Sequence, residues 1–299
     1  MTLPALSVRS ELGDTPMADV VRVARGLDDA LHAPRLIILI HGYQNSETAA
    51  HESFSTFAER LATVGWPTAL ARFGTLWEFH WPGNHPNRIV SLATYSVRVP
   101  EAIRAGEKLA EFLGDLSAEQ EVCLVAHSLG CRVALETVHK IGLMGAGYRG
   151  PQVSQVFLMA AAVPVPLCES GQRLDRAAPG DVHHVYHSNR DSALTRAKFG
   201  IGQSGYGGEL ERGPAVGLEG APEPRWASSV PTGIDHGGYW SSYLVAEDIA
   251  RRLGVVTERS LPEHTVPVWD LEDLWVSLDA EEGMAEREIT SRDATESVA

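Results

Sequence analysis

The sequence has few cysteines, no long apolar run and no excess of basic residues, and each absence excludes a class of protein. Its three cysteines cannot all pair with one another, so we expect reduced thiols and a cytoplasmic protein. No run approaches the ~18 apolar residues of a transmembrane helix, so we expect no membrane partner. The formal net charge of −14 argues against binding to nucleic acid or to anionic lipid.

Motifs for metal ions and nucleotides are also lacking. The chain has neither the cysteine and histidine spacing of a zinc site nor a P-loop. Residues 200–205 match G-x-G-x-x-G, but no strand is predicted before them and no helix after them. We therefore expect no cofactor and no metal. The first twenty residues lack the basic and apolar regions of a secretory signal, which agrees with a cytoplasmic location.

Charge divides the chain at about residue 257. Twelve acidic residues and only three arginines follow this point, whereas the preceding part carries an ordinary balance of charge. We predict a single domain over residues 1–256 and an acidic C-terminal tail over residues 257–299 that is partly disordered or docked. The segment Val268–Val276 is apolar enough to dock on its own domain, and docking on a partner is the alternative.

Predicted strands and helices alternate along the domain. The run Leu36–Ile40 is apolar throughout, which is typical of a strand buried on both faces of a sheet. The predicted strands are Val20–Ala24, Leu36–Ile40, Leu76–Trp81, Val122–Val125, Val153–Met159 and Val182–His187. The predicted helices are Ala50–Val64, one from Tyr95 or Pro100 to Leu113, one after Gly130, and Gly238–Leu253. This alternation predicts an α/β fold with a parallel sheet covered by helices on both faces.

The segment Val122–Gly130 carries the strongest functional signal. An apolar strand is followed by Ala-His-Ser-Leu-Gly and then by apolar residues at helical spacing. A serine at the apex of a strand–turn–helix is typical of a nucleophile elbow, because the helix directs its positive end at the hydroxyl. Ala126 replaces the first glycine of G-x-S-x-G but is still small. The alternative is an ordinary turn that contains Ser128.

A nucleophilic serine needs a general base, and the base needs a carboxylate to orient it. In doubly wound hydrolases these residues follow in the order Ser, Asp, His on loops after strands. Asp191 follows the strand Val182–His187, and His236 precedes the last helix. A helix N-cap for Asp191 and a surface helix cap for His236 are the alternatives. Asp181 precedes its strand and Asp235 adjoins the histidine, so neither is favoured.

An oxyanion hole needs two backbone N–H groups directed at the developing charge. Leu129, directly after the serine, provides the first. The loop after Leu36–Ile40 begins His41-Gly42-Tyr43, and we expect the N–H of Tyr43 to be the second donor. Gly42 allows the tight turn. His41 is expected to support the loop by hydrogen bonding rather than to act as a catalyst.

Taken together, these segments resemble the α/β-hydrolase superfamily over about residues 18–254. The resemblance is carried by Ile40–Tyr43, Ala126–Gly130, Asp191 and His236. Trp81–Gly83 and Asp235–Trp240 are similar to a branch of uncharacterised bacterial serine hydrolases. The resemblance implies eight mostly parallel strands. Because Val163–Gly180 is short, only a minimal cap is expected, with the glycine-rich loop Phe199–Arg225 over the site.

The activity implied by this resemblance is that of an esterase-like serine hydrolase. It would cleave a small-molecule acyl substrate, a carboxylic ester, through an acyl-enzyme. The implied catalytic residues are Ser128, Asp191 and His236, with oxyanion donors Tyr43 and Leu129 and substrate contacts at Gly42, Trp81 and Tyr239. Thioesterase, amidase or acyltransferase activity with the same triad is an alternative, as is a non-catalytic binding protein. The oligomeric state is left open.

Overall fold

The computed structural model describes residues 3–10, 17–26, 31–64, 74–83, 95–175, 183–196, 211–222, 226 and 228–255. All of them belong to the first of two units, Met1–Thr257. The acidic tail and the G-x-G-x-x-G segment lie outside the described residues, as does most of the glycine-rich loop. The predictions made for these segments therefore stay predictions.

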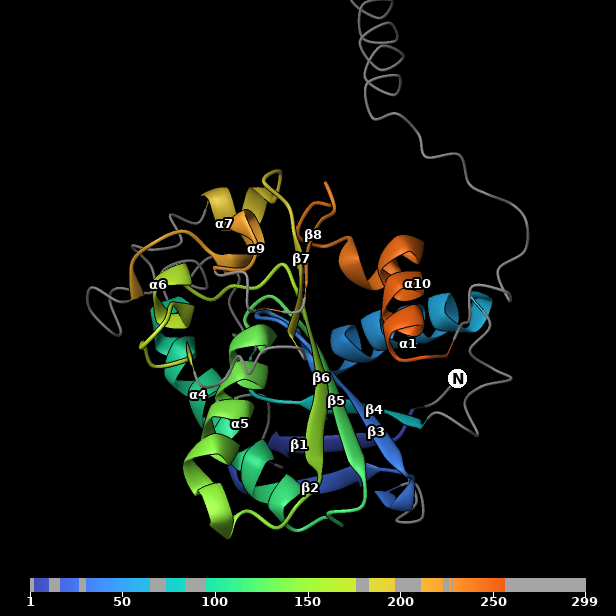
Figure 1. Cartoon of the computed structure of the whole chain (residues 1–299). Coiled ribbons are helices and arrows are strands. Elements are labelled where there is room, and N and C mark those ends of the chain that lie inside the picture. Colours follow the sequence, from blue (N-terminus) through green and yellow to red (C-terminus); the bar gives the residue numbers. More distant parts are fainter. Residues whose placement is uncertain are drawn as a thin grey trace, which may run out of the picture. The chain divides into compact units, whose positions relative to one another are not determined.

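A central sheet of eight strands organises the described residues (Figure 1). The strands are β1 (Ala5–Arg9), β2 (Met17–Arg25), β3 (Arg35–Ile40), β4 (Thr75–His80), β5 (Glu121–His127), β6 (Gln152–Met159), β7 (His183–His187) and β8 (Ser228–Pro231). Their order in the sheet is β2-β1-β4-β3-β5-β6-β7-β8. Only β1 and β2 pair antiparallel, and all other neighbours are parallel. The predicted mostly parallel sheet is confirmed.

Helices cover both faces of this sheet, as predicted. Figure 1 shows α4 (Tyr95–Gly114) and α5 (Gly130–Met144) on one face, with α1 (Glu47–Thr63) and α10 (Tyr243–Arg252) on the other. Short helices α6 (Val165–Cys168), α7 (Ser192–Arg196) and α9 (Val216–Glu219) lie in the connections between the later strands. None of the described helices is long and apolar enough to cross a lipid bilayer.

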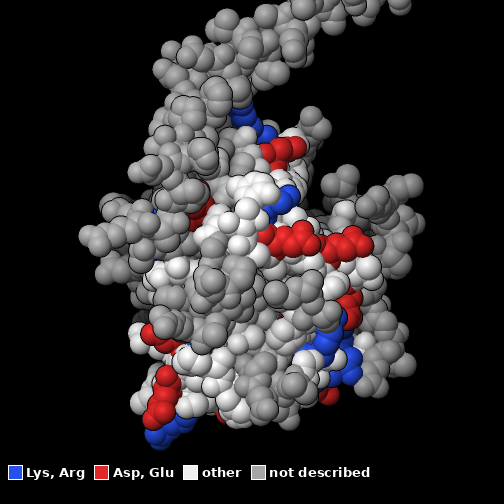
Figure 2. All heavy atoms as spheres, turned by 90° about the vertical axis from the view of Figure 1, so that its right-hand side faces the viewer, with Lys and Arg blue, Asp and Glu red and all other residues white. Residues whose placement is uncertain are grey.

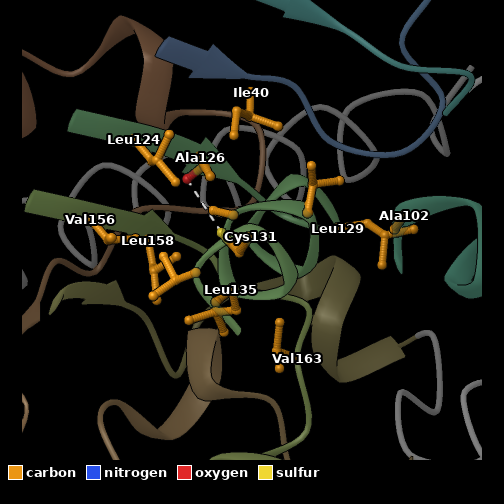
Figure 3. Close-up of a cluster of buried hydrophobic side chains, with 14 of the residues drawn as sticks. Ile40, Ala102, Leu124, Ala126, Leu129, Cys131, Leu135, Val156, Leu158 and Val163 are labelled. Atoms are coloured by element: carbon orange, nitrogen blue, oxygen red, sulfur yellow. Dashed lines mark hydrogen bonds between the residues drawn. The ribbon is translucent and has the colours of Figure 1, made fainter. Parts of the chain in front are cut away.

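Two apolar cores lie on opposite faces of the sheet. Successive side chains of β3 point to opposite faces and therefore belong to the two cores in turn. Leu36, Ile38 and Ile40 join the core under α4 and α5, whereas Ile37 and Leu39 join the core under α1 and α10. Figure 3 shows part of the first core around α5. Because burial of apolar surface is the main favourable contribution to folding, these two cores hold the sheet and its loops in place.

Figure 2 shows the face of the molecule that carries α1 and α10. Its described side chains include both signs of charge. Ion pairs within α10 join Arg251 to Glu247 at 2.9 Å and Arg252 to Asp248 at 2.7 Å. Pairs of this kind on a helix surface contribute little to stability, so the cores rather than the surface charges stabilise this face.

The structure corrects the sequence-based assignment at three elements. Strands β1 and β8 were not predicted, because β1 is short and interrupts its apolar residues with Ser7 and Arg9, and β8 is an edge strand that ends in Pro231. The last helix begins at Tyr243 rather than at Gly238, because Ser242 caps it by accepting a hydrogen bond from the Val245 N–H.

Buried neutral histidines make the stability of this fold sensitive to acid. His183 in β7 is completely buried, and neither ring nitrogen has a hydrogen-bond partner in the described part of the chain. Burial lowers the pKa of His183 to about 3 and is the main cause that lowers the pKa of His184 to about 4. An unfolded histidine titrates near pH ~6.5. The unfolded state therefore binds more protons below that pH, and folding stability falls as the pH is lowered from ~6.5 toward ~4.

We predict that His183→Phe reduces this acid sensitivity. Phenylalanine keeps a ring against Trp226, whose ring centroid lies 5.4 Å away, and removes a titrating group. Between pH ~6.5 and ~4 the variant should lose about 2 kcal/mol less unfolding free energy than the wild type. Urea unfolding across a pH series measures this. Replacing the exposed His32 by Gln should leave the wild-type pH dependence unchanged, and an equal slope in His183→Phe would contradict the prediction.

Candidate active site

Ser128 lies in a strained turn at the carboxyl end of β5. Its φ of 54° is in the left-handed region, which residues other than glycine seldom adopt. The Ser128 N–H donates to the Met159 carbonyl at 2.9 Å, and the Ser128 carbonyl accepts from the N–H groups of Cys131 and Ala162, both at 3.1 Å. The neighbouring strand β6 and the first turn of α5 thus hold the serine in a conformation that would otherwise be unfavourable.

Small residues around the turn allow this close packing. A Cβ on Gly130 would lie 2.4 Å from the carbonyl oxygen of His41 and 2.7 Å from that of Ile40. Only glycine fits there without moving the end of β3. The methyl group of Ala126 is buried in the core beside α5. The Ala126 carbonyl accepts a hydrogen bond from the Cys131 thiol (Figure 3). Alanine at this position is therefore compatible with the elbow.

The side chains of Ser128, His236 and Asp191 are joined in sequence by two hydrogen bonds. His236 Nε2 lies 2.9 Å from Ser128 Oγ, and His236 Nδ1 lies 2.7 Å from Asp191 Oδ2. Because a carboxylate only accepts hydrogen bonds, Nδ1 carries the proton and Nε2 accepts from the serine hydroxyl. Asp191 is completely buried, whereas the His236 side chain is 22 % exposed. The structure thus contains a continuous hydrogen-bond relay from a buried carboxylate to a serine hydroxyl.

Asp191 makes contacts of both kinds considered from the sequence. Its Oδ2 contacts the histidine, and its Oδ1 accepts from the Leu194 N–H at 2.9 Å in the first turn of α7. Asp235 is directed elsewhere, because its carboxylate accepts from the N–H and the hydroxyl of Ser192. The two acidic side chains therefore join the loop after β7 to the loop after β8, and only Asp191 bonds to the imidazole ring.

The loop after β3 is braced from several sides. His41 is buried, which lowers its pKa well below its usual value, and its Nδ1–H donates to the Gly42 carbonyl at 2.8 Å. The Trp81 indole N–H donates to the His41 carbonyl at 2.8 Å. The guanidinium of Arg9 donates to the Asn45 carbonyl at 2.9 Å, and one of its nitrogens lies 3.3 Å from His41 Nε2. No motif in the sequence indicated Arg9 or Asn45.

The two predicted oxyanion segments adjoin the serine. The Leu129 N–H has no hydrogen-bond partner within the described ranges. Gly42 brings the loop that contains Tyr43 against the elbow, since a Cβ on Gly42 would lie 2.8 Å from Ser128 Cβ. The loop after β3 and the turn after β5 therefore meet at Ser128.

Two of the predicted substrate contacts have buried side chains. Trp81 is completely buried and stacks on His41 with ring centroids 5.5 Å apart. Tyr239 is also completely buried, and its hydroxyl lies 3.2 Å from the Thr232 hydroxyl. The two rings belong to the two apolar cores, Trp81 to the core under α4 and α5 and Tyr239 to the core under α1 and α10.

An ion-pair cluster lies on α5, one turn after the serine. The buried Arg132 pairs with Glu136 at 2.8 Å and with Glu211 at 2.9 Å. Arg173 also pairs with Glu136. The cluster therefore joins two segments to α5: Glu211 comes from the segment before α9, and Arg173 comes from the segment after α6. Among the residues that the structure describes, no group of three or more side chains is arranged to hold a metal ion.

The match to a protein-family model agrees with this architecture. A family model described as "Alpha/beta hydrolase of unknown function (DUF900)" matches residues 25–203, and the predicted α/β-hydrolase fold is thereby confirmed. Two solved structures are similar: RedJ with a polyethylene glycol molecule bound in its active site, and a cutinase-like protein from Cryptococcus sp.. Their identities are 13% and 14%, with TM-scores of 0.37 and 0.32. The alignments cover 80% and 74% of this chain and 98% and 93% of the other chains. No curated protein matches the sequence.

The packing of the elbow can be tested at two glycines of one helix. Gly130→Ala should lower the unfolding free energy by about 2 kcal/mol or more, because the methyl group would meet two backbone carbonyls that cannot move cheaply. Gly142→Ala is the matched control in α5, where no atom lies within 4 Å, and it should raise stability by about 0.5–1 kcal/mol. Denaturant unfolding measures both. Equal stabilisation by the two substitutions would contradict the account of the turn.

Proposed function

The chain belongs to a family of α/β hydrolases of unknown function, and we propose that it acts as a serine hydrolase on carboxylic esters. One observation carries the proposal: the two hydrogen bonds that join Asp191 to His236 and His236 to Ser128. Each residue follows a parallel strand of one sheet, so their side chains converge at its carboxyl edge. This convergence in the order Ser, Asp, His supports nucleophilic catalysis.

In the proposed reaction Ser128 Oγ attacks the ester carbonyl while its proton passes to His236 Nε2. The Asp191 carboxylate keeps the Nδ1–H tautomer and stabilises the imidazolium that forms. Collapse of the tetrahedral intermediate breaks the bond to the alkoxy group, which leaves as an alcohol with the proton from Nε2. Water then attacks the acyl-enzyme by the same route, and the acid leaves as Ser128 is regenerated.

Backbone dipoles are proposed to stabilise the tetrahedral oxyanion. The donors are the N–H groups of Leu129 and Tyr43, and the positive end of the helix dipole of α5 points at the same place. Losing one such donor typically raises the barrier by about 3–4 kcal/mol. The left-handed backbone at Ser128 supports this assignment, because in a nucleophile elbow the N–H after the serine contributes to the oxyanion hole.

The proposal also covers the substrate, the alternative of a non-catalytic protein and the cellular location. A small acyl compound is the proposed substrate, and thioesters, amides or acyl transfer would use the same three residues. A non-catalytic binding protein is disfavoured by the intact hydrogen-bond relay, which such a protein would not need. A cytoplasmic location is supported by three free cysteines, all buried in the fold.

Ser128→Ala tests the nucleophile directly. The substitution should lower kcat for short-chain nitrophenyl esters by at least about 10⁴-fold, because no other group can form the acyl-enzyme. The control is Ser154→Ala near the opposite end of β6, where the hydroxyl lies 3.4 Å from Cys123 Sγ, and it should retain activity. Thermal unfolding should show both variants folded. A Ser128→Ala variant that hydrolyses every ester at the wild-type rate would remove Ser128 from the mechanism.

The carboxylate is tested by comparing two neighbouring acids. Asp191→Asn keeps the shape but presents an amide to His236 Nδ1, so it should slow turnover by up to about 10⁴-fold. Asp235→Asn loses only a contact to Ser192 and should slow turnover by less than about 10-fold. Steady-state kinetics on one ester distinguishes the two. Full activity in Asp191→Asn would exclude it as the orienting carboxylate.

A further inference from the structure

His127 connects the elbow to the backbone of the loop that carries the catalytic histidine. It is the last residue of β5, directly before Ser128, and it is buried. Its Nε2 lies 2.7 Å from the His236 carbonyl oxygen. Because a carbonyl only accepts hydrogen bonds, the Nε2–H of His127 is the donor, and this fixes its tautomer. Burial, and to a lesser degree the adjacent His236, lowers the pKa of His127 to about 3, so the ring is neutral at working pH.

The loop around His236 needs such an anchor. Gly237 and Gly238 follow the histidine directly, and glycine leaves the backbone free to adopt many conformations. Two contacts hold the backbone here: the Gly238 N–H donates to the Asp235 carbonyl at 2.9 Å and closes the turn, and His127 holds the His236 carbonyl itself. A rotation of the peptide between His236 and Gly237 would turn the imidazole away from the serine.

The surroundings of His127 hold its own ring in place. Its centroid lies 5.0 Å from that of His236, 6.0 Å from that of Tyr239 and 6.1 Å from that of Trp240. On the other side, a Cβ on Gly42 would lie 3.2 Å from His127 Nδ1. The ring therefore fills the space between the loop after β3 and the loop after β8. A ring confined in this way presents its N–H in one direction only.

We propose that His127 is a positioning residue that holds the backbone of His236 so that its Nε2 faces Ser128 Oγ. The proposal rests on the proposed function of Ser128 and His236. His127 touches neither the substrate nor the serine hydroxyl in this role. It acts through one hydrogen bond, and that bond requires a donor at the Nε2 position. An aromatic ring without the donor would fill the space but release the loop.

Three substitutions separate the hydrogen bond from the packing. His127→Phe keeps the ring and removes the donor. His127→Gln places an amide N–H at about the distance of Nε2 from the backbone, so it can donate to the same carbonyl. His127→Asn carries the same amide one methylene shorter and cannot reach. If the Phe variant fails to fold, Gln and Asn still form a matched pair of neutral amides.

The experiment measures kcat and KM on one ester together with the rate of fluorophosphonate labelling, and thermal unfolding reports folding. His127→Phe and His127→Asn should lower kcat and the labelling rate by about 10- to 100-fold with KM nearly unchanged, since a displaced catalytic group slows the chemical steps rather than binding. His127→Gln should retain at least about a third of the wild-type rate. This rescue would not occur if the residue served only packing.

Two results would overturn the proposal: wild-type kinetics in a folded His127→Phe variant, or equal losses in His127→Gln and His127→Asn. Both are distinct from failure of the proposed function. In that case the wild-type protein itself would neither hydrolyse an ester nor react with the fluorophosphonate, and both proposals would fall together.

Discussion

The close approach of the end of β3 to the start of α5 is the constraint on which the site depends. It requires glycine at position 130, where any side chain would collide with two carbonyls, and it presses Gly42 against Ser128. The serine is held in a left-handed conformation that costs about 1–3 kcal/mol, so the surrounding structure must over-determine it. Hydrogen bonds from β6 and α5 provide that restraint.

Parallel strands explain why residues far apart in the sequence meet at this point. The loops after β3, β5, β7 and β8 all leave the same edge of the sheet. Polar contacts fix three of these loops: Arg9 braces the first, and Asp191 and Asp235 join the last two. His127 links the elbow to the last loop. The neutral state of the buried histidines follows from the same burial that positions them.

Local sequence patterns were sufficient to predict most of the sheet and the strand–turn–helix at Ser128. Leu36–Ile40 and Val122–Val125 are unbroken apolar runs, Ser128 and Asp191 each follow a predicted strand, and His236 was placed by its position before the last helix. Strands β1 and β8 were missed because they are short and contain polar residues or proline. The bracing by Arg9 depends on contacts between residues 36 positions apart, which no local pattern reveals. The burial of the Trp81 and Tyr239 rings in the two cores depends on tertiary packing, which no local pattern reveals.

The central claim is that the hydroxyl of Ser128 is a nucleophile activated by His236. Incubation of the full chain with a fluorophosphonate, followed by intact-mass measurement and peptide mapping, tests it most directly. We expect one adduct per chain, located on Ser128 and prevented by prior denaturation of the protein. An unmodified protein, or an adduct on any other residue, would show that Ser128 is not the nucleophile.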